Sequence, residues 1–484
     1  MTRKIIVKSS CIEVHGYEAG DSERLERSLC YWDEIYYKVI EFALHYDVEN
    51  KILYLPRGID VGFVEKEIGV PAETNYDARL IKKSNKIRLH TLPRNELQKK
   101  SIAFLMGQAE FASNATRSQL ILNLSTGAGK TYCTVAGIAL SNTVPLILTH
   151  SDNIKGQWRD SFEAYTDIAE SDILDIKSSS VIERIMKGKI KPKYRVYLAN
   201  RQTIGSYCKK HGWDKLQEVF AVLGIGIKVF DEAHLTTAVN FKIDYYTNVE
   251  LTYYLTATFA RSHEKEDKII NLAFKNVPRY GEESREVLRK HIIYTRVLYD
   301  SKPEFNQRAE MSGAKGFDPN KFSEYNLNSQ RFIDNLYTVI DSVLNMNPDK
   351  KLRCMLTTST INSTNVLAEK IQKDYPDLIV GAYNSEMEQA DKLEVLNNAN
   401  IIVTTIKGLG TGSDIEGLRF LINTVPYKSK VTADQLTGRL RYRDEKGTVY
   451  FEMIDKAFNQ ILKWDKHRSK IIYQKTKKNL ELNL

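Results

Sequence analysis

Residues 120–140 contain the residue types that bind phosphate. The apolar run Leu120–Leu124 and a helical pattern through Leu140 flank the turn Ser125-Thr126-Gly127-Ala128-Gly129-Lys130-Thr131. A strand, a glycine-rich turn and a helix in this order form a P-loop, whose backbone N–H groups close around phosphate oxygens at the helix N-terminus. Lys130 can then reach the β- and γ-phosphates, and the Thr131 hydroxyl can ligate Mg²⁺. Leu124 stands where the first glycine of GxxxxGK[ST] is expected, so an ordinary glycine-rich turn stays open as the alternative.

A pair of carboxylates follows a later apolar run. Residues Ile227–Phe230 end in Asp231-Glu232-Ala233-His234. We expect this run to be a strand beside the P-loop strand, which places Asp231 where it can organise Mg²⁺ and Glu232 where it can polarise the attacking water. Four such residues could merely follow the end of any strand. Their position in the chain after Lys130 and after an apolar run favours the catalytic interpretation. The sequence thus predicts hydrolysis of ATP with Mg²⁺ as cofactor.

Length and composition limit the class of protein. The 484 residues are 42% hydrophobic and 27% charged, which is typical of several folded globular domains. The formal net charge of +9 suits a polyanionic partner. The five cysteines are odd in number and form no CxxC pair, which argues against a disulfide framework or a zinc ribbon. No signal peptide or long apolar run is evident, so we expect no membrane association and a cytoplasmic location.

Two series of short β-branched runs alternate with helical patterns in the central and C-terminal parts of the chain. This alternation is typical of parallel sheets flanked by helices. A polar, turn-rich stretch from Ser301 to Ser329 separates the two series and is interpreted as a linker or an exposed insertion. Residues 23–45 are expected to form one or two helices within a separate N-terminal module. The predicted domains are an N-terminal accessory domain (1–88), a first α/β domain (89–300), the linker (301–329) and a second α/β domain with a basic tail (330–484).

Further motifs follow the order found in one family. They are Thr91-Leu92-Pro93-Arg94-Asn95-Glu96-Leu97-Gln98, Thr149-His150, Gln157-Trp158, Asn200-Arg201-Gln202, Leu255-Thr256-Ala257-Thr258, Thr404-Thr405 with Gly408, Gly412 and Asp414, and Gln435-Leu436-Thr437-Gly438-Arg439-Leu440-Arg441. Together with the P-loop and the carboxylate pair, they resemble the motifs of a superfamily 2 helicase, a two-lobed DNA or RNA motor, over residues 90–455. The resemblance implies an α/β fold of two tandem RecA-like parallel-sheet motor domains, here with a small α+β N-terminal domain.

The resemblance also implies roles for single residues. Gln98 would contact the adenine base, and hydrolysis would be coupled to strand movement by His234, Thr256, Thr258 and Gln435. Gly412 and Asp414 would add to the nucleotide contacts of Thr126, Gly127, Ala128 and Gly129. DNA contacts would come from Thr149, His150, Asn200, Arg201, Gln202, Thr404 and Thr405. Trp158 lies at helical spacing from Ile154 and Phe162, so we expect it in the core rather than stacked on a base.

Arginines in the last motif would complete the catalytic site. A γ-phosphoryl group in transfer spreads negative charge over its oxygens, so an arginine supplied across an interdomain cleft stabilises the transition state. Arg439 falls on the first arginine of the family motif. The usual spacing puts the second arginine at Tyr442, which lies between Arg441 and Arg443. We expect Arg441 to take that role.

The architecture narrows the kind of motor. A compact two-lobed chain with a small N-terminal module resembles the bacteriophage branch-migration helicases. We therefore expect an ATP-dependent DNA helicase or translocase for forked and branched DNA in replication, recombination or repair. It would work as a monomer, in the host cytoplasm if a phage encodes it. The alternatives are an RNA helicase and, in a different class, a nucleotide-gated clamp that binds DNA without processive translocation.

Two further features have alternative interpretations. The aromatic residues Tyr31, Trp32, Tyr36 and Tyr37 could stack on unpaired bases, but on a helix they are expected in the core. The lysine-rich stretch 456–478 could follow a phosphate backbone or simply face solvent.

Overall fold

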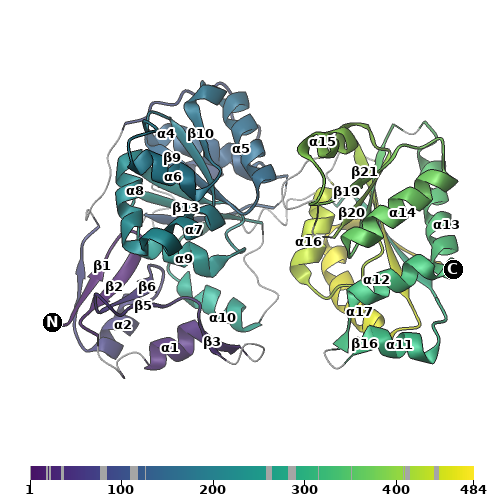
Figure 1. Cartoon of the computed structure of the whole chain (residues 1–484), viewed down its shortest axis with the longest axis horizontal. Helices are drawn as coiled ribbons and strands as arrows, with labels where there is room; N and C mark the ends of the chain where they lie inside the picture. The colour runs from purple at the N-terminus through teal and green to yellow at the C-terminus, as the bar shows by residue number, and fades with distance from the viewer. Residues whose placement is uncertain are drawn as a thin grey trace. The chain divides into compact units, whose positions relative to one another are not determined.

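The structure is a computed structural model. It describes residues 2–17, 20, 23–33, 38–76, 84–108, 118–125, 127–257, 264–281, 290–313, 316–349, 351–406, 408, 415–440 and 446–484. The chain divides into two compact units, Met1–Glu286 and Val287–Leu484, and each is described by itself (Figure 1). Within the described ranges, no helix is long and apolar enough to cross a membrane.

The first unit begins with a small mixed sheet. Its strand order is β5-β6-β2-β1-β7, and all neighbours are antiparallel except β1 and β7. The strands are β1 (Lys4–Val7), β2 (Cys11–His15), β5 (His45–Asp47), β6 (Ile52–Pro56) and β7 (Ala72–Thr74). The module also contains α1 (Glu23–Leu29), α2 (Val61–Ile68) and the hairpin of β3 (Cys30–Asp33) and β4 (Lys38–Glu41). This composition confirms the predicted α+β character.

The aromatic segment after α1 is a hairpin rather than a helix. Tyr31 pairs with Ile40 and Trp32 with Val39 across β3 and β4. Aromatic and β-branched residues favour such cross-strand pairs, and this preference outweighs the helical pattern read over residues 23–45. The side chain of Trp32 is 50% exposed, so its predicted place in the core is wrong. Tyr36 and Tyr37 lie outside the described residues.

A larger sheet forms the rest of the first unit. Its order is β10-β11-β9-β12-β13-β8-β14, and all neighbours are parallel. The strands are β8 (Gln119–Asn123), β9 (Val144–Thr149), β10 (Ile173–Ile176), β11 (Val196–Asn200), β12 (Ile225–Phe230), β13 (Leu251–Thr256) and β14 (Arg279–Tyr280). The helices are α3 (Glu96–Leu105), α4 (Lys130–Ser141), α5 (Asp152–Tyr165), α6 (Ser179–Met186), α7 (Arg201–His211), α8 (Leu216–Leu223), α9 (Thr237–Tyr245) and α10 (Glu264–Ala273), with short 3₁₀ turns η2 (Glu170–Asp172) and η3 (Trp213–Lys215). Parallel neighbours need crossover connections, which the helices supply.

The order of this sheet corrects one expectation. The strand that precedes Asp231 was expected beside the P-loop strand, but β13 lies between β12 and β8. The order of the motifs along the chain predicts that β8 and β12 end at the same edge of the sheet. It does not predict which strand lies between them. The end of β13 therefore stands between the two halves of the predicted site.

The N-terminal sheet shares its core with the larger sheet. Ile5, Val14 and Leu55 belong to the same apolar cluster as Phe230 and Tyr254. In Figure 1, β2 and β6 lie beside α9 of the same unit. The predicted boundary at residue 88 therefore differs from the observed division, because the described apolar residues of the N-terminal sheet share one core with the larger sheet.

A buried ion pair reinforces this junction. Lys228 Nζ lies 2.6 Å from Asp244 Oδ1, and the two side chains are 0% and 2% exposed. Lys228 also donates to Ser10 Oγ of the N-terminal module at 3.2 Å and to Thr247 Oγ1 at 2.8 Å. Burial disfavours the charged form of Lys228 and lowers its pKa, and Asp244 opposes that shift. The contacts with oxygen atoms offset the loss of hydration.

The second unit is built on another parallel sheet. Its order is β19-β20-β18-β21-β22-β15-β23. The strands are β15 (Ile292–Tyr299), β18 (Arg353–Thr358), β19 (Val380–Tyr383), β20 (Ile401–Thr405), β21 (Leu418–Asn423), β22 (Thr448–Asp455) and β23 (Thr476–Asn483), and a hairpin contains β16 (Ser312–Gly313) and β17 (Gly316–Phe317). The helices are α11 (Phe305–Met311), α12 (Pro319–Asn328), α13 (Gln330–Met346), α14 (Ile361–Asp374), α15 (Gln389–Asn398), α16 (Lys430–Arg439) and α17 (Asn459–Ile472), followed by η5 (Tyr473–Lys475). Two parallel sheets confirm the predicted fold class.

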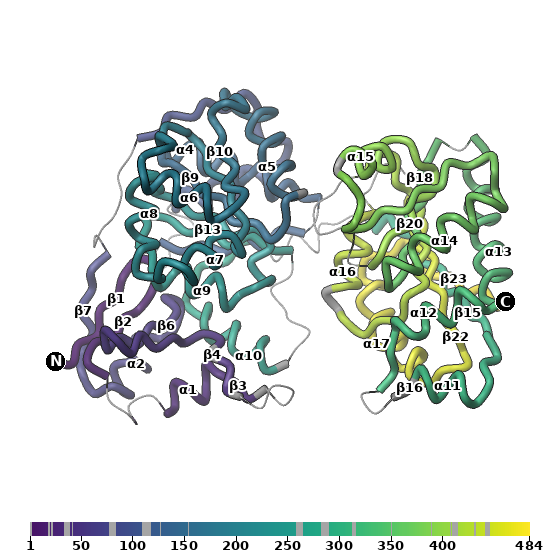
Figure 2. The backbone as a smooth tube through the Cα atoms, viewed as in Figure 1, coloured from purple at the N-terminus to yellow at the C-terminus, as the bar shows by residue number. Residues whose placement is uncertain are grey.

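The start of the second unit differs from the predicted domain boundaries. Strand β15 pairs with β22 and with the C-terminal β23 (Figure 2), so this unit begins before residue 300. Residues 301–329 do not form a linker, because they contain α11 and α12. Met311 and Phe322 are buried in one cluster with Phe458. The polar and turn residues that suggested a linker include a helix cap, since Asp318 accepts from Asn320 N and Lys321 N in front of Pro319.

The buried pair in the first unit gives a stability prediction. Replacing Lys228 with methionine should destabilise the chain by about 3 kcal/mol, because it leaves the Asp244 carboxylate buried without its cation. Chemical denaturation followed by circular dichroism measures this loss. The double variant K228M/D244L should recover most of it, while K215M, at an exposed lysine, should have little effect. A loss below about 1 kcal/mol for K228M would show that the pair does not hold the junction.

Candidate nucleotide-binding site

The predicted P-loop connects β8 to α4. Gly127 and Gly129 have φ values of 84° and 92°, a region that favours glycine. Gly129 is the N-cap of α4, and Lys130 is the first residue of that helix. A Cβ atom on Gly129 would lie 2.2 Å from Nε2 of Gln98. The conformation of the turn therefore favours glycine at position 129, and a larger residue would also have to displace the end of the Gln98 side chain. Thr126 lies outside the described residues.

Gln98 lies against this turn. Its Oε1 accepts from Arg94 N at 2.8 Å, and its Nε2 donates to Ala128 O at 3.4 Å. The side chain is buried in the first part of α3, behind the N-cap Asn95. Gln98 thus fastens the segment 91–98 to the P-loop. Contact with an adenine base stays a prediction, since both ends of its amide already have protein partners.

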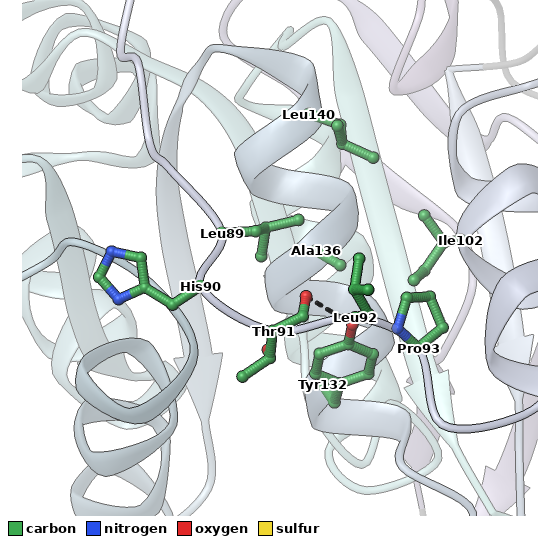
Figure 3. A pocket seen from close by; sticks show the side chains of 9 residues that line it. All are labelled: Leu89, His90, Thr91, Leu92, Pro93, Ile102, Tyr132, Ala136 and Leu140. Atoms are coloured by element: carbon green, nitrogen blue, oxygen red, sulfur yellow. Dashed lines mark hydrogen bonds between the residues drawn. The ribbon is translucent and has the colours of Figure 1, made fainter.

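An apolar pocket lies beside the P-loop helix. It has a volume of about 240 Å³ and is lined by Leu89, His90, Thr91, Leu92, Pro93, Ile102, Tyr132, Ala136 and Leu140 (Figure 3). Tyr132, two residues after Lys130, donates its hydroxyl to Thr91 O at 3.2 Å. A planar, largely apolar group such as a nucleobase suits walls of this composition.

The carboxylate pair follows β12. Asp231 Oδ1 accepts from Glu232 N at 2.9 Å, and Asp231 Oδ2 accepts from Trp158 Nε1 at 2.9 Å. Across the site, Lys130 Nζ lies 3.3 Å from Glu232 Oε1, and each of these two side chains is 13% exposed. The structure therefore brings the P-loop lysine and the predicted catalytic carboxylates together at one edge of the sheet.

The two carboxylates differ in their electrostatic surroundings. Burial raises the pKa of Asp231, and the charge of Glu232 raises it further, against the opposing effect of Lys130. Burial would also raise the pKa of Glu232, but Lys130 and His234 outweigh it, so the net shift is downward. The lowered pKa keeps Glu232 ionised at neutral pH, as a general base must be.

Two of the predicted coupling residues, His234 and Thr256, meet in this site. His234 Nδ1 lies 3.0 Å from Thr256 Oγ1 and 3.3 Å from Glu232 Oε2. Thr256 is the last residue of β13, the strand between the two halves of the site. A displacement at the end of β13 would therefore reach Glu232 through one histidine. Thr258 lies outside the described residues.

The predicted DNA-contacting residues of the first unit do not share one environment. Thr149 is buried and donates to Asn200 Oδ1 at 2.7 Å, at the ends of the adjacent strands β9 and β11. His150 is partly buried; burial and the nearby charge of Arg201 lower its pKa to about 4. Gln202 is exposed. Of the five predicted DNA-contacting residues in this unit, Gln202 is the one whose side chain is exposed to solvent.

Arg201 differs most from its predicted role. It is 1% exposed and donates to the backbone carbonyl of Asp231 and, at 3.3 Å, to Thr236 Oγ1. Such burial leaves it no open surface for a phosphate backbone. The cause is electrostatic, because two adjacent carboxylates in a buried turn draw in a second cation beside Lys130.

Sequence reasoning missed two parts of this site. Trp158 is buried, as predicted, yet its indole N–H also holds Asp231. Arg201 was assigned to DNA rather than to the catalytic turn. The indole N–H of Trp158, a polar atom on an otherwise apolar helical face, was a sign in the sequence that this residue could form a buried hydrogen bond. Nothing in the sequence indicated that the Arg201 side chain is buried against the turn after β12.

The second unit presents the remaining predicted residues. Thr404 and Thr405 end β20, and Thr404 is buried. Gln435 and Arg439 lie on α16, both partly exposed, and the segment before α16 is held by a hydrogen bond of 3.0 Å from Arg468 Nη1 to Tyr427 O. Gly412, Asp414 and Arg441 lie outside the described residues. The roles of these residues stay predictions.

The residues present fit a magnesium ion that arrives with a nucleotide. The available donors are the Thr131 hydroxyl and the Asp231 carboxylate, which are the hard oxygen ligands that Mg²⁺ prefers. Within the described ranges, no group of three or more His, Cys, Asp or Glu residues could hold a metal ion.

Comparisons with known proteins agree with the fold. Residues 91–261 match a family described as "Type III restriction enzyme, res subunit". No curated protein matches the chain in sequence. Among solved structures, Mss116p bound to ssRNA and AMP-PNP aligns with a TM-score of 0.54 and 14% identity over 80% of this chain and 74% of that one. Dbp5 of S. cerevisiae bound to RNA and ADP BeF3 aligns with a TM-score of 0.53 and 12% identity over 80% and 89%.

A further alignment, with T4 UvsW, covers 100% of this chain and 99% of that one at 14% identity, but its TM-score of 0.38 is too low to support an inference. The Mss116p and Dbp5 alignments show a shared fold. The chain thus resembles superfamily 2 helicases, as predicted: residues 91–261 match the restriction-enzyme subunit family in sequence, and the chain shares the tandem RecA-like fold of Mss116p and Dbp5.

The site gives a prediction for Glu232. Replacing it with glutamine should lower the rate of ATP hydrolysis by ~10²–10⁴-fold, because the amide cannot accept a proton from water. Nucleotide binding should be kept, since Lys130 and the P-loop are unchanged. Single-turnover hydrolysis and titration with a fluorescent ATP analogue separate the two effects. E218Q, at an exposed glutamate on α8, is the control; hydrolysis by E232Q within tenfold of the wild type would refute the assignment of the base.

Proposed function

We propose that the chain is an ATP-dependent DNA helicase or translocase that acts on forked and branched DNA. One contact carries the hydrolytic part of the proposal: Lys130 Nζ of the P-loop lies 3.3 Å from Glu232 Oε1. This places a phosphate-binding cation next to a carboxylate with a lowered pKa. A site with that pair and a neighbouring Asp231 has the parts for phosphoanhydride hydrolysis.

The residues of the chain divide the work of hydrolysis. Backbone N–H groups of the P-loop and Lys130 bind the phosphates, and Tyr132 and the apolar pocket beside it hold the base. Once Lys130 turns to the phosphates, Glu232 is left to accept a proton from the attacking water. Mg²⁺, held by Thr131 and Asp231, would neutralise charge on the phosphate oxygens.

Support for a nucleic-acid partner comes from one face of α17. Lys463, Lys466, His467 and Lys470 follow the i, i+3, i+4, i+7 spacing of a single helical face. The three lysines lie at the surface of this helix. Asp465, the only acidic residue of α17, is 2% exposed and pairs with Arg296 Nη2 at 2.5 Å. The lysine face of α17 therefore carries cations without a neutralising carboxylate of its own, which suits a phosphate backbone.

An RNA helicase is the second candidate. Mss116p and Dbp5, which share the fold, were both solved with RNA. The choice of DNA rests on the resemblance of the compact architecture to the phage branch-migration helicases. It does not rest on a contact that reads DNA bases. Stimulation of hydrolysis by RNA but not by DNA would therefore favour the second candidate.

The proposed activity is tested with matched substrates. ATP hydrolysis and strand separation should be greater on forks and Holliday junctions than on blunt linear duplex of equal length. The variant K130A should abolish hydrolysis and leave DNA binding without nucleotide intact, because the proposed role of Lys130 is to bind the phosphates of ATP and not those of DNA. Equal activity on blunt duplex would remove the preference for branched DNA. Tight ATP-dependent DNA binding without multiple turnover would indicate a clamp.

The basic face of α17 makes a separate prediction. The triple variant K463Q/K466Q/K470Q should weaken DNA binding at low salt and reduce the slope of log K against log salt by up to ~3 units, about one for each phosphate that is no longer neutralised. Hydrolysis in the absence of DNA should not change. The variant K187Q/K189Q/K191Q removes the same charge from an exposed loop of the first unit. Equal effects of both triple variants would show that net charge, rather than this face, attracts DNA.

A further inference from the structure

The turn that carries Glu232 is strained. Glu232 and Thr236 have φ values of 47° and 51° without being glycine. Backbone of this kind is unfavourable for residues other than glycine and persists only where neighbouring groups hold it. The segment Asp231–Thr236 therefore needs fixed partners, and the structure supplies two from different helices.

The first partner is Arg201, the first residue of α7. One guanidinium nitrogen donates to the carbonyl of Asp231, at the start of the turn, and another donates to Thr236 Oγ1 at 3.3 Å, at its end. The planar guanidinium can span the two acceptors, which a lysine ammonium cannot match. Burial lowers the pKa of Arg201 to about 10, so the group stays charged at neutral pH.

The second partner is Trp158, in the middle of α5. Its indole N–H donates to Asp231 Oδ2, while Asp231 Oδ1 accepts from Glu232 N. With one donor on each oxygen, the carboxylate is held against rotation. Trp158 is 1% exposed, so water does not compete for this bond.

The two helices are tied together at their beginnings. Asn200, the residue before Arg201, accepts from Thr149 Oγ1 at 2.7 Å and donates from Nδ2 to Asp152 Oδ1 at 2.9 Å. Asp152 is the first residue of α5, the helix that carries Trp158. The strand ends of β9 and β11 and the starts of α5 and α7 thus form one hydrogen-bonded group.

We propose that Arg201 and Trp158 are positioning residues that hold Glu232 and Asp231 in their catalytic geometry and transmit movement of the Thr149–Asn200–Asp152 group to the catalytic turn. This inference rests on the proposed function. It replaces direct contact with DNA, predicted for Arg201, by an indirect effect: a strand that displaces the starts of α5 and α7 alters the turn.

Three variants test the proposal, each with a readout that a merely structural role would not give. W158F keeps an aromatic ring and removes the donor; the Mg²⁺ concentration needed for binding a fluorescent non-hydrolysable ATP analogue should rise about tenfold, while binding in EDTA stays unchanged. R201K should lower kcat about tenfold or more without changing the KM for ATP or the affinity for DNA without nucleotide. T236V removes one acceptor of Arg201 and should lower kcat in the same way, which keeps the test valid if R201K does not fold.

The outcomes separate the proposal from its premise. W213F is the control for W158F and should leave all readouts unchanged. Trp213 lies in η3 and packs on Tyr246. Loss of DNA affinity in R201K with kcat retained would restore the direct contact and overturn the inference. Equal weakening of analogue binding in Mg²⁺ and in EDTA by W158F would also overturn it. A wild-type chain without ATP hydrolysis on any nucleic acid would instead refute the proposed function.

Discussion

The balance of charge in the turn after β12 is the constraint on which the rest of the site depends. Asp231 and Glu232 are adjacent carboxylates in a poorly hydrated position, and each raises the free energy of the other's charged form. Lys130 and Arg201 provide the balancing cations from opposite directions, one after β8 and one after β11. The order of the sheet determines whether both can reach the turn. The geometry of the proposed catalytic site therefore depends on the whole sheet rather than on two short motifs.

The local parts of the site could be predicted from the sequence because their chemistry is local. The P-loop needs glycine at positions 127 and 129 for conformations that other residues rarely adopt, and such a requirement is visible in the residue types themselves. Likewise, Asp231 and Glu232 follow an apolar run that is recognisable as a strand. The fold class followed in the same way from alternating strand and helix patterns.

The features of the site that the sequence did not predict depend on contacts between distant segments of the chain. The inserted strand β13, the inward course of Arg201 and the hydrogen bond of Trp158 each join residues far apart in the chain. The predicted domain boundaries differ from those of the structure for a related reason. Residues 301–329 resemble a linker in composition, yet the buried side chains of Met311 and Phe322 anchor this segment in the second unit. Composition reports average polarity, whereas burial depends on where the few apolar side chains point.

The inserted strand also explains why His234 and Thr256 belong to the site. Because β13 ends between the P-loop strand and the strand of Asp231, Thr256 meets His234 at 3.0 Å, and the same histidine nitrogen lies 3.3 Å from Glu232. Glu232 is thus approached from one side by β13 through His234, while Arg201 and Trp158 hold the turn from α7 and α5. The backbone strain at Glu232 makes this arrangement sensitive, since a strained turn relaxes when any one support moves. If Glu232 is the catalytic base, as proposed, a base held in this way responds to displacements of three separate elements, which is the property that the proposed motor needs for hydrolysis to depend on a bound strand.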